Sequence, residues 1–86
     1  MEFDPAKDAA NIAKHGVSLS RAAELAIETV VTDDRNAERR FRAYGVLDGR
    51  PYCLAFTLRG GDVRPISLRR AHQKEYRRHV PSSPDR

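Results

Sequence analysis

The sequence predicts an α+β fold in which two N-terminal helices pack on an antiparallel β-sheet and a C-terminal helix follows. Two patterns predict this order. Apolar residues recur at helical spacing between residues 6 and 27, whereas they alternate with polar residues between residues 38 and 70. These periods are typical of a helix with one buried side and of a strand with one buried face. The segment 70–80 is polar, basic and compatible with a helix.

The first helix is expected to extend from Pro5 to His15. Asp4 is a favourable N-cap, and Pro5 fits the first helical position because its missing N–H would have no partner there. Gly16 can end the helix in the left-handed conformation. A short edge strand is expected before it, at residues 2–4. The buried side of the helix would consist of small residues and one isoleucine: Ala6, Ala9, Ala10, Ile12 and Ala13.

Ser18 is the expected N-cap of the second helix. The β-branched run from Thr29 to Thr32 predicts the first strand after this helix. The polar residues 33–36 should end that strand. The apolar stripe of the second helix recurs at spacings of three and four residues: Leu19, Ala22, Ala23, Ala26 and Ile27.

A hairpin is expected at Asp48-Gly49. This dipeptide lies between two alternating runs and indicates a type I′ turn, because that turn needs a positive φ at both central residues. The two-residue loop would form an apolar face from four pairs: Leu47 with Arg50, Gly45 with Tyr52, Ala43 with Leu54, and Phe41 with Phe56. The opposite face would carry Arg40, Arg42, Tyr44, Cys53, Ala55, Thr57 and Arg59.

The next turn decides which residues of the last strand face the core. A two-residue loop would bury Ser67 and Arg69, whereas a three-residue loop, Gly60 to Asp62, would turn both outward. Because a slip of one residue reverses every side chain, burial of the apolar residues favours the three-residue loop. The pairs expected from it are Phe56 with Ile66 and Leu54 with Leu68.

Length and composition favour one small soluble domain. The chain of 86 residues is long enough for a single core over residues 1–80, and residues 81–86 are expected to be a disordered tail. Neither a secretory signal nor a membrane-length apolar run is visible. The single cysteine, Cys53, fits a reducing cytoplasm, and too few His and Cys residues are present for a structural zinc site.

The net charge of +4 conceals an asymmetry. Residues 1–34 hold three basic and seven acidic residues, a balance of −4, whereas residues 35–86 hold thirteen basic and five acidic residues, a balance of +8. Such asymmetry favours an anionic partner for the second part of the chain. A solvated basic face is the alternative, since a basic stripe is only the electrostatic footprint of nucleic-acid binding.

Several short motifs occur in order along residues 2–80: Phe3-Asp4-Pro5-Ala6-Lys7, Lys14-His15-Gly16-Val17-Ser18, Glu38 with Arg40-Phe41, and Ile66-Ser67 with Arg69, Ala71 and Glu75. In these motifs the chain resembles the BrnT toxins of type II toxin–antitoxin systems. The resemblance implies a RelE-like fold and a ribonuclease that inhibits translation. It also implies a BrnA-type antitoxin with a ribbon-helix-helix domain, through which the complex binds operator DNA. Family members often end the last helix with a tyrosine, where this chain has Arg77-Arg78-His79.

Candidate catalytic residues follow from the needs of RNA cleavage without metal or cofactor. If the 2′-hydroxyl of the substrate is the nucleophile, the protein needs positive charge at the phosphate and groups for proton transfer. Arg40 and Arg69 are the phosphate candidates, with surface arginines paired to carboxylates as the alternative. His72 could be an acid or a base, and the alternative, a surface residue at the start of the helix, is slightly favoured. Glu38 could orient Arg40 or act as a base, with an exposed ion pair as the alternative. Glu75 matches the family glutamate, and an intrahelical ion pair is its alternative.

The RNA-binding candidates are Arg42, Tyr44 and Arg59, which share the basic face of the sheet with Arg40 and Arg69, and in addition Arg70. Tyr44 could stack on a base. His15 is interpreted mainly as structural, because a cation near a helix C-terminus interacts well with the helix dipole. Two rival hypotheses remain for the chain as a whole. It could be an inactive relative that only binds the antitoxin and tunes operator binding, or a general nucleic-acid-binding domain.

Overall fold

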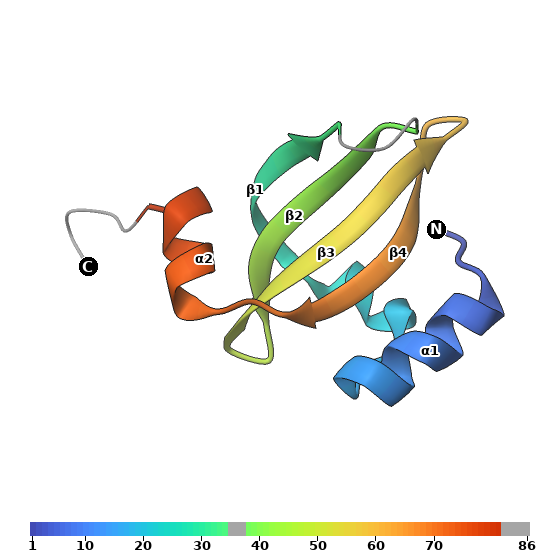
Figure 1. Ribbon diagram of the computed structural model, residues 1–86, viewed down its shortest axis with the longest axis horizontal. Coiled ribbons are helices and arrows are strands. Elements are labelled where there is room, and N and C mark those ends of the chain that lie inside the picture. Colours follow the sequence, from blue (N-terminus) through green and yellow to red (C-terminus); the bar gives the residue numbers. More distant parts are fainter. Residues whose placement is uncertain (35–37, 82–86) are drawn as a thin grey trace.

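The computed structural model describes residues 1–34 and 38–81 and contains one four-stranded antiparallel sheet with helical segments around it (Figure 1). The strand order is β1-β2-β3-β4, so each strand pairs with its neighbours in sequence. The expected α+β class is therefore confirmed. The elements are α1 (Pro5–His15), the 3₁₀ helix η1 (Leu19–Glu24), β1 (Ala26–Asp33), β2 (Arg40–Leu47), β3 (Arg50–Arg59), β4 (Asp62–Arg70) and α2 (Gln73–His79).

Helix α1 begins and ends where the sequence predicts. The side chain of Asp4 accepts a hydrogen bond from the N–H of Ala6 (2.8 Å), and Pro5 occupies the first turn. Gly16 adopts φ 74° and donates its N–H to the carbonyl of Ile12 (2.8 Å). Both ends are thus fixed by local capping, which depends only on neighbouring residues.

The buried side of α1 is a correction to the expected alanine stripe. Its four alanines and Ile12 are exposed, and the buried residue of the helix is Asn11, which is 5% exposed. The Asn11 amide donates to the carbonyls of Leu68 (2.8 Å) and Val17 (2.9 Å), and it accepts from the N–H of Leu68 (3.0 Å). Strand β4 is an edge strand, so the backbone of Leu68 has no neighbouring strand on its outer side. The Asn11 amide makes the two hydrogen bonds that such a strand would make there.

The second helix is shorter than expected. The segment after Ser18 is a 3₁₀ helix that ends at Glu24, and Ala26 and Ile27 belong to β1. Residues 26–33 pair with β2 instead of continuing the helix. Strand β1 approaches β2 closely at Ile27, whose partner is Gly45. A Cβ atom at Gly45 would collide with the carbonyl oxygen of Ala26, so this approach requires a glycine.

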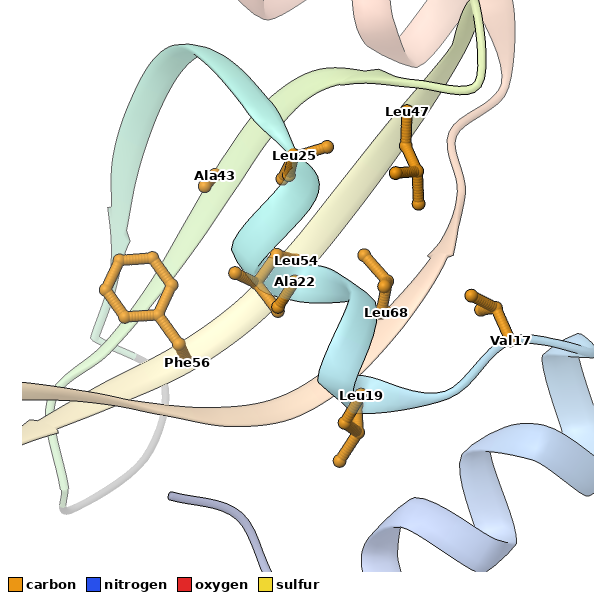
Figure 2. Packing of buried hydrophobic residues seen from close by; sticks show 9 residues of the cluster. All are labelled: Val17, Leu19, Ala22, Leu25, Ala43, Leu47, Leu54, Phe56 and Leu68. Atoms are coloured by element: carbon orange, nitrogen blue, oxygen red, sulfur yellow. The ribbon is translucent and has the colours of Figure 1, made fainter. Parts of the chain in front are cut away.

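Helix η1 covers the apolar face of the sheet. Figure 2 shows it lying across the strands, with its apolar side chains next to those of β2, β3 and β4. Phe3 packs against this cluster from an irregular N-terminal segment, so the edge strand expected at residues 2–4 is wrong. The cluster consists of Val17, Leu19, Ala22, Leu25, Ala43, Leu47, Leu54, Phe56 and Leu68.

The β2–β3 hairpin confirms the predicted register. Asp48 and Gly49 have φ values of 53° and 73°, as a type I′ turn requires. All four expected pairs occur: Leu47 with Arg50, Gly45 with Tyr52, Ala43 with Leu54, and Phe41 with Phe56.

The β3–β4 connection differs from the expected three-residue loop. Arg59 pairs with Asp62 around a two-residue turn at residues 60–61. Leu54 pairs with Leu68 as expected, but the register shifts by one residue after Ala55. A β-bulge in β4 therefore takes up the extra residue and keeps Leu68 in the core.

The bulge changes which β4 side chains share a face. Phe56 pairs with Pro65 and not with Ile66, and Pro65 is fully buried. Arg64 pairs with Thr57, two positions along β3 from Ala55, so Arg64 lies on the same face as Arg69. The three-residue loop would have placed Arg64 on the apolar face.

Helix α2 covers part of the opposite face of the sheet and begins at Gln73, because Arg70 still pairs with Tyr52 in β4. Beneath it lies a second small core, formed by Tyr44, Cys53 and Ala71, with Val31, Tyr76 and Val80 packed around them. The expected basic face is therefore partly closed.

Residues 35–37 of the expected β1–β2 turn region and residues 82–86 of the expected tail lie outside the described residues. Within residues 1–34 and 38–81, no helix is long and apolar enough to span a membrane.

Asn11→Ala should lower the free energy of unfolding by about 2–3 kcal/mol, because it leaves the buried N–H and carbonyl of Leu68 without partners. Urea unfolding measures this change. Ile12→Ala is the control, since Ile12 is 47% exposed on the same helix and should change stability by no more than about 0.5 kcal/mol. Equal effects of the two substitutions would contradict the role assigned to Asn11.

Candidate active site

A basic groove runs between the C-terminal end of α1, strand β4 and the N-terminal end of α2. It consists of two adjoining open pockets of about 560 Å³ and 390 Å³. Both pockets are lined by Lys14, His15 and Arg69. We define the basic groove by its charged and titratable residues: Lys7, Lys14, His15, Arg69, Arg70, His72 and Glu75.

Arg69 and Glu75 form a bidentate ion pair at this groove. The two Arg69 terminal nitrogens donate to the two Glu75 carboxylate oxygens at 2.9 Å and 2.8 Å. The side chains are 32% and 20% exposed, respectively. Such a planar pair fixes the direction of the guanidinium as well as its position. Arg69 is therefore held at the groove wall with part of its surface open to solvent.

Two side chains of β2 extend this pair, Tyr44 beneath α2 and Arg42 beside it. The hydroxyl of Tyr44 donates to Oε2 of Glu75 (2.9 Å). Nη1 of Arg42 donates to the hydroxyl oxygen of Tyr44 (3.1 Å). The Tyr44 side chain is fully buried, so this hydrogen bond also satisfies a hydroxyl that would otherwise lack a partner.

The electrostatics of the pair favour its charged form. The Arg69 guanidinium lowers the pKa of Glu75 to about 2, with smaller contributions from the Tyr44 hydroxyl and the His72 backbone. Glu75 in turn raises the pKa of Arg69. Burial, followed by the hydrogen bond to Glu75, raises the pKa of Tyr44. Near neutral pH, Glu75 is thus a carboxylate and Tyr44 is a hydrogen-bond donor.

His15 is a site residue that the sequence interpretation underestimated. It is the last residue of α1, and the chain turns away from the groove at Gly16. Its imidazole lines both pockets. Partial burial, with Lys14 and Arg69 nearby, lowers the pKa of His15 below its usual 6.5. The neutral imidazole therefore predominates at pH 7, in contrast to the cationic helix-end role expected for it. In the sequence, the motif Lys14-His15-Gly16 was the feature that could have identified His15 as a site residue.

Four of the candidates predicted from the sequence lie together in the basic groove: Arg69, Arg70, His72 and Glu75. His72 is the exposed N-cap of α2, and its side chain makes no capping hydrogen bond. Arg70 lies above the ring of Tyr52, 6.0 Å from its centroid. Arg42 joins the group through Tyr44. These residues come from β2, β4 and α2, so the sheet and α2 together assemble the site.

Tyr44 cannot stack on a base as expected. It lies on the predicted face, but α2 covers it, and none of its surface is exposed. The ring of His79 stacks on it at 4.6 Å between centroids, and Tyr76 contacts it edge-on at 6.4 Å. Its role is to anchor α2 and Glu75.

The remaining candidates lie away from the groove. Arg40 begins β2, four residues from Tyr44 and about 13 Å along the strand. Glu38 is exposed just before β2. Arg59 lines a small separate pocket with Arg64 and three other residues. The sequence interpretation missed Arg64, because the bulge that turns it to this face leaves no simple pattern.

The described residues contain neither a reactive cysteine nor a group of metal ligands. Cys53 is 2% exposed, and burial raises the pKa of its thiol, which makes it a poor nucleophile. Within residues 1–34 and 38–81, no three His, Cys, Asp or Glu side chains form a group that could hold a metal ion.

Comparisons with known proteins indicate one family. A family model described as the ribonuclease toxin, BrnT, of type II toxin–antitoxin systems matches residues 3–75. The crystal structure of the ribonuclease toxin BrnT from Brucella abortus is similar, with a TM-score of 0.67 and 28% sequence identity. That similarity covers 85% of this chain and 96% of the Brucella chain. No curated protein sequence matched the chain.

Glu75→Gln should lower stability at neutral pH by about 1–2 kcal/mol, after allowance for solvent screening of a partly open pair. The pKa of Glu75 is lowered from 4.5 to about 2. The contribution of Glu75 to the free energy of unfolding is therefore present above pH 4.5 and is lost as the pH falls towards 2. Urea unfolding between pH 7 and pH 3 measures both effects.

The matched control is Glu24→Gln, which removes a carboxylate that is 58% exposed and pairs with Arg21. Its effect on stability should be much smaller. If the acid-induced loss of stability were the same in wild type and Glu75→Gln, Glu75 would not be the group that titrates.

Proposed function

Because the chain belongs to the BrnT family of ribonuclease toxins of type II toxin–antitoxin systems, we propose that it cleaves RNA in the basic groove, with the substrate's own 2′-hydroxyl as nucleophile. The observation that carries this proposal is the arrangement around Arg69. A guanidinium held in a fixed direction by Glu75 shares one groove with Lys14 and with two imidazoles, those of His15 and His72.

The proposed reaction is an intramolecular transesterification. The 2′-oxygen bonds to the adjacent phosphorus while the bond from phosphorus to the 5′-oxygen breaks. A base takes the proton of the 2′-hydroxyl, and an acid donates a proton to the leaving 5′-oxygen. The products are a 2′,3′-cyclic phosphate and a 5′-hydroxyl. No step requires a metal ion.

The groove residues suit these roles. His15 is the proposed base, because its lowered pKa leaves it neutral near pH 7. His72, on the α2 side of the groove, is the proposed acid. Arg69 and Lys14 would stabilise the charge that develops on the phosphate oxygens. Glu75 and Tyr44 act as positioning residues: Glu75 pairs with Arg69, and Tyr44 donates a hydrogen bond to Glu75.

The wider proposal concerns the setting of this activity. We propose that the chain acts in the cytoplasm, where RNA cleavage would inhibit translation. A BrnA-type antitoxin with a ribbon-helix-helix domain would neutralise it and carry the complex to operator DNA. We also propose a RelE-like classification of the fold, which the helix-covered antiparallel sheet supports.

Cleavage of a fluorescent RNA oligonucleotide in the presence of EDTA tests the chemistry. The expected products carry a 2′,3′-cyclic phosphate and a 5′-hydroxyl, which mass spectrometry identifies. Arg69→Gln and His15→Gln should each reduce kcat by about 10²-fold or more. Arg50→Gln, an exposed arginine at the β2–β3 turn, is the control and should cleave like wild type. Protection by EDTA, or products with 3′-hydroxyl ends, would contradict the mechanism.

The pH dependence of cleavage tests the role of His15. A base must be deprotonated to act, and the pKa of His15 is lowered from 6.5. The acid limb of the kcat/KM profile, which reports groups of the free enzyme, should therefore have its midpoint below pH 6.5. This limb should be absent from the residual activity of His15→Gln. An unchanged acid limb in that variant would assign the base to another residue.

A further inference from the structure

Three arginines gather on the face of the sheet that α2 leaves open. Arg40 and Arg42 come from β2, and Arg64 comes from β4. Arg42 pairs with Ala55, and Arg64 pairs with Thr57, so their side chains leave the sheet on the same side. We call Arg40, Arg42 and Arg64 the arginine face.

The arginine face differs from the other arginines in its ion pairs, although Asp33 is the cross-strand partner of Arg40 and Asp62 lines a pocket with Arg64. Elsewhere Arg21 pairs with Glu24 and Asp48, and Arg69 pairs with Glu75. Within residues 1–34 and 38–81, no carboxylate forms an ion pair with any of the three members.

The members are nevertheless not freely solvated. All three are half-buried, and the Nε atoms of Arg40 and Arg42 are buried without a hydrogen-bond partner in the described part of the chain. Strand spacing puts the Cα atoms of Arg40 and Arg64 about 10 Å apart, on either side of the buried Thr57. Like charges held this close repel one another, and a bound polyanion would relieve the repulsion.

The arginine face continues directly from the basic groove. Ser67 of β4 lines the groove and pairs with Ala55 of β3. Ala55 pairs in turn with Arg42 of β2. Along β4 the distance from Arg69 to Arg64 is roughly 15 Å at the usual rise per residue. A single-stranded RNA a few nucleotides long can span this distance.

We propose that the arginine face binds the backbone phosphates of single-stranded RNA next to the cleavage position at Arg69. This inference rests on the proposed function and extends its substrate to an RNA several nucleotides long. Among the described residues the face offers no uncovered aromatic ring, because Tyr44 lies beneath α2. It therefore binds phosphates and not bases, and it gives affinity without strong sequence preference.

The test compares Arg64→Gln with the control Arg50→Gln, which removes an equal charge from the β2–β3 turn. The probe is an eight-nucleotide RNA with 2′-deoxy substitutions, which the proposed chemistry cannot cleave. Arg64→Gln should weaken its binding about tenfold and reduce the salt slope by about 0.7 for one lost phosphate contact. Arg50→Gln should bind it like wild type.

A second measurement compares the cleavage of an all-RNA octanucleotide with that of a dinucleotide. In Arg64→Gln the octanucleotide rate should fall relative to the dinucleotide rate, since only the longer substrate reaches the arginine face. Equal binding by Arg64→Gln and Arg50→Gln would overturn the proposal. So would a loss of antitoxin affinity in Arg64→Gln with RNA binding unchanged, because the face would then serve the antitoxin. If wild type binds the probe through Arg64 but cleaves neither RNA, the proposed function fails and the binding site stands.

Discussion

The bidentate ion pair between Arg69 and Glu75 is the interaction on which the site depends. It joins the last strand to the last helix. Glu75 also accepts the hydrogen bond of Tyr44, the most deeply buried side chain under α2. A single carboxylate therefore couples the packing of the small second core to the direction of a guanidinium in the basic groove. Lys14 and His15 reach the same groove because Asn11 fastens α1 to the edge of β4.

Much of the fold could be predicted because its signals are local. The ends of α1 depend on Asp4 and Gly16, and the β2–β3 register depends on the turn at residues 48–49. The errors concern features that distant residues determine. The bulge that pairs Phe56 with Pro65 allows β4 to follow a two-residue turn and still bury Leu68. The buried Asn11 looks polar and exposed in the sequence, because its partners lie on β4 and after α1.

The candidate site was predicted in part for the same reason. Alternation along the strands identified Arg69, and proximity in sequence identified His72 and Glu75, all of which lie in the basic groove. Alternation also placed Tyr44 on the right face, but it could not show that α2 covers that residue. His15 was undervalued because its helix-end position has a local explanation, whereas its nearness to Arg69 depends on how α1 meets β4.

A double-mutant cycle on RNA cleavage tests most directly whether Tyr44 acts on Arg69 through Glu75. Tyr44→Phe removes one hydroxyl and keeps the buried ring, so kcat can be compared in folded variants. With Glu75 present, Tyr44→Phe should lower kcat about three- to tenfold, with little change in KM. In the Glu75→Gln background the same substitution should leave kcat unchanged. An equal loss in both backgrounds would show that Tyr44 and Glu75 act independently, and would contradict this account of the site.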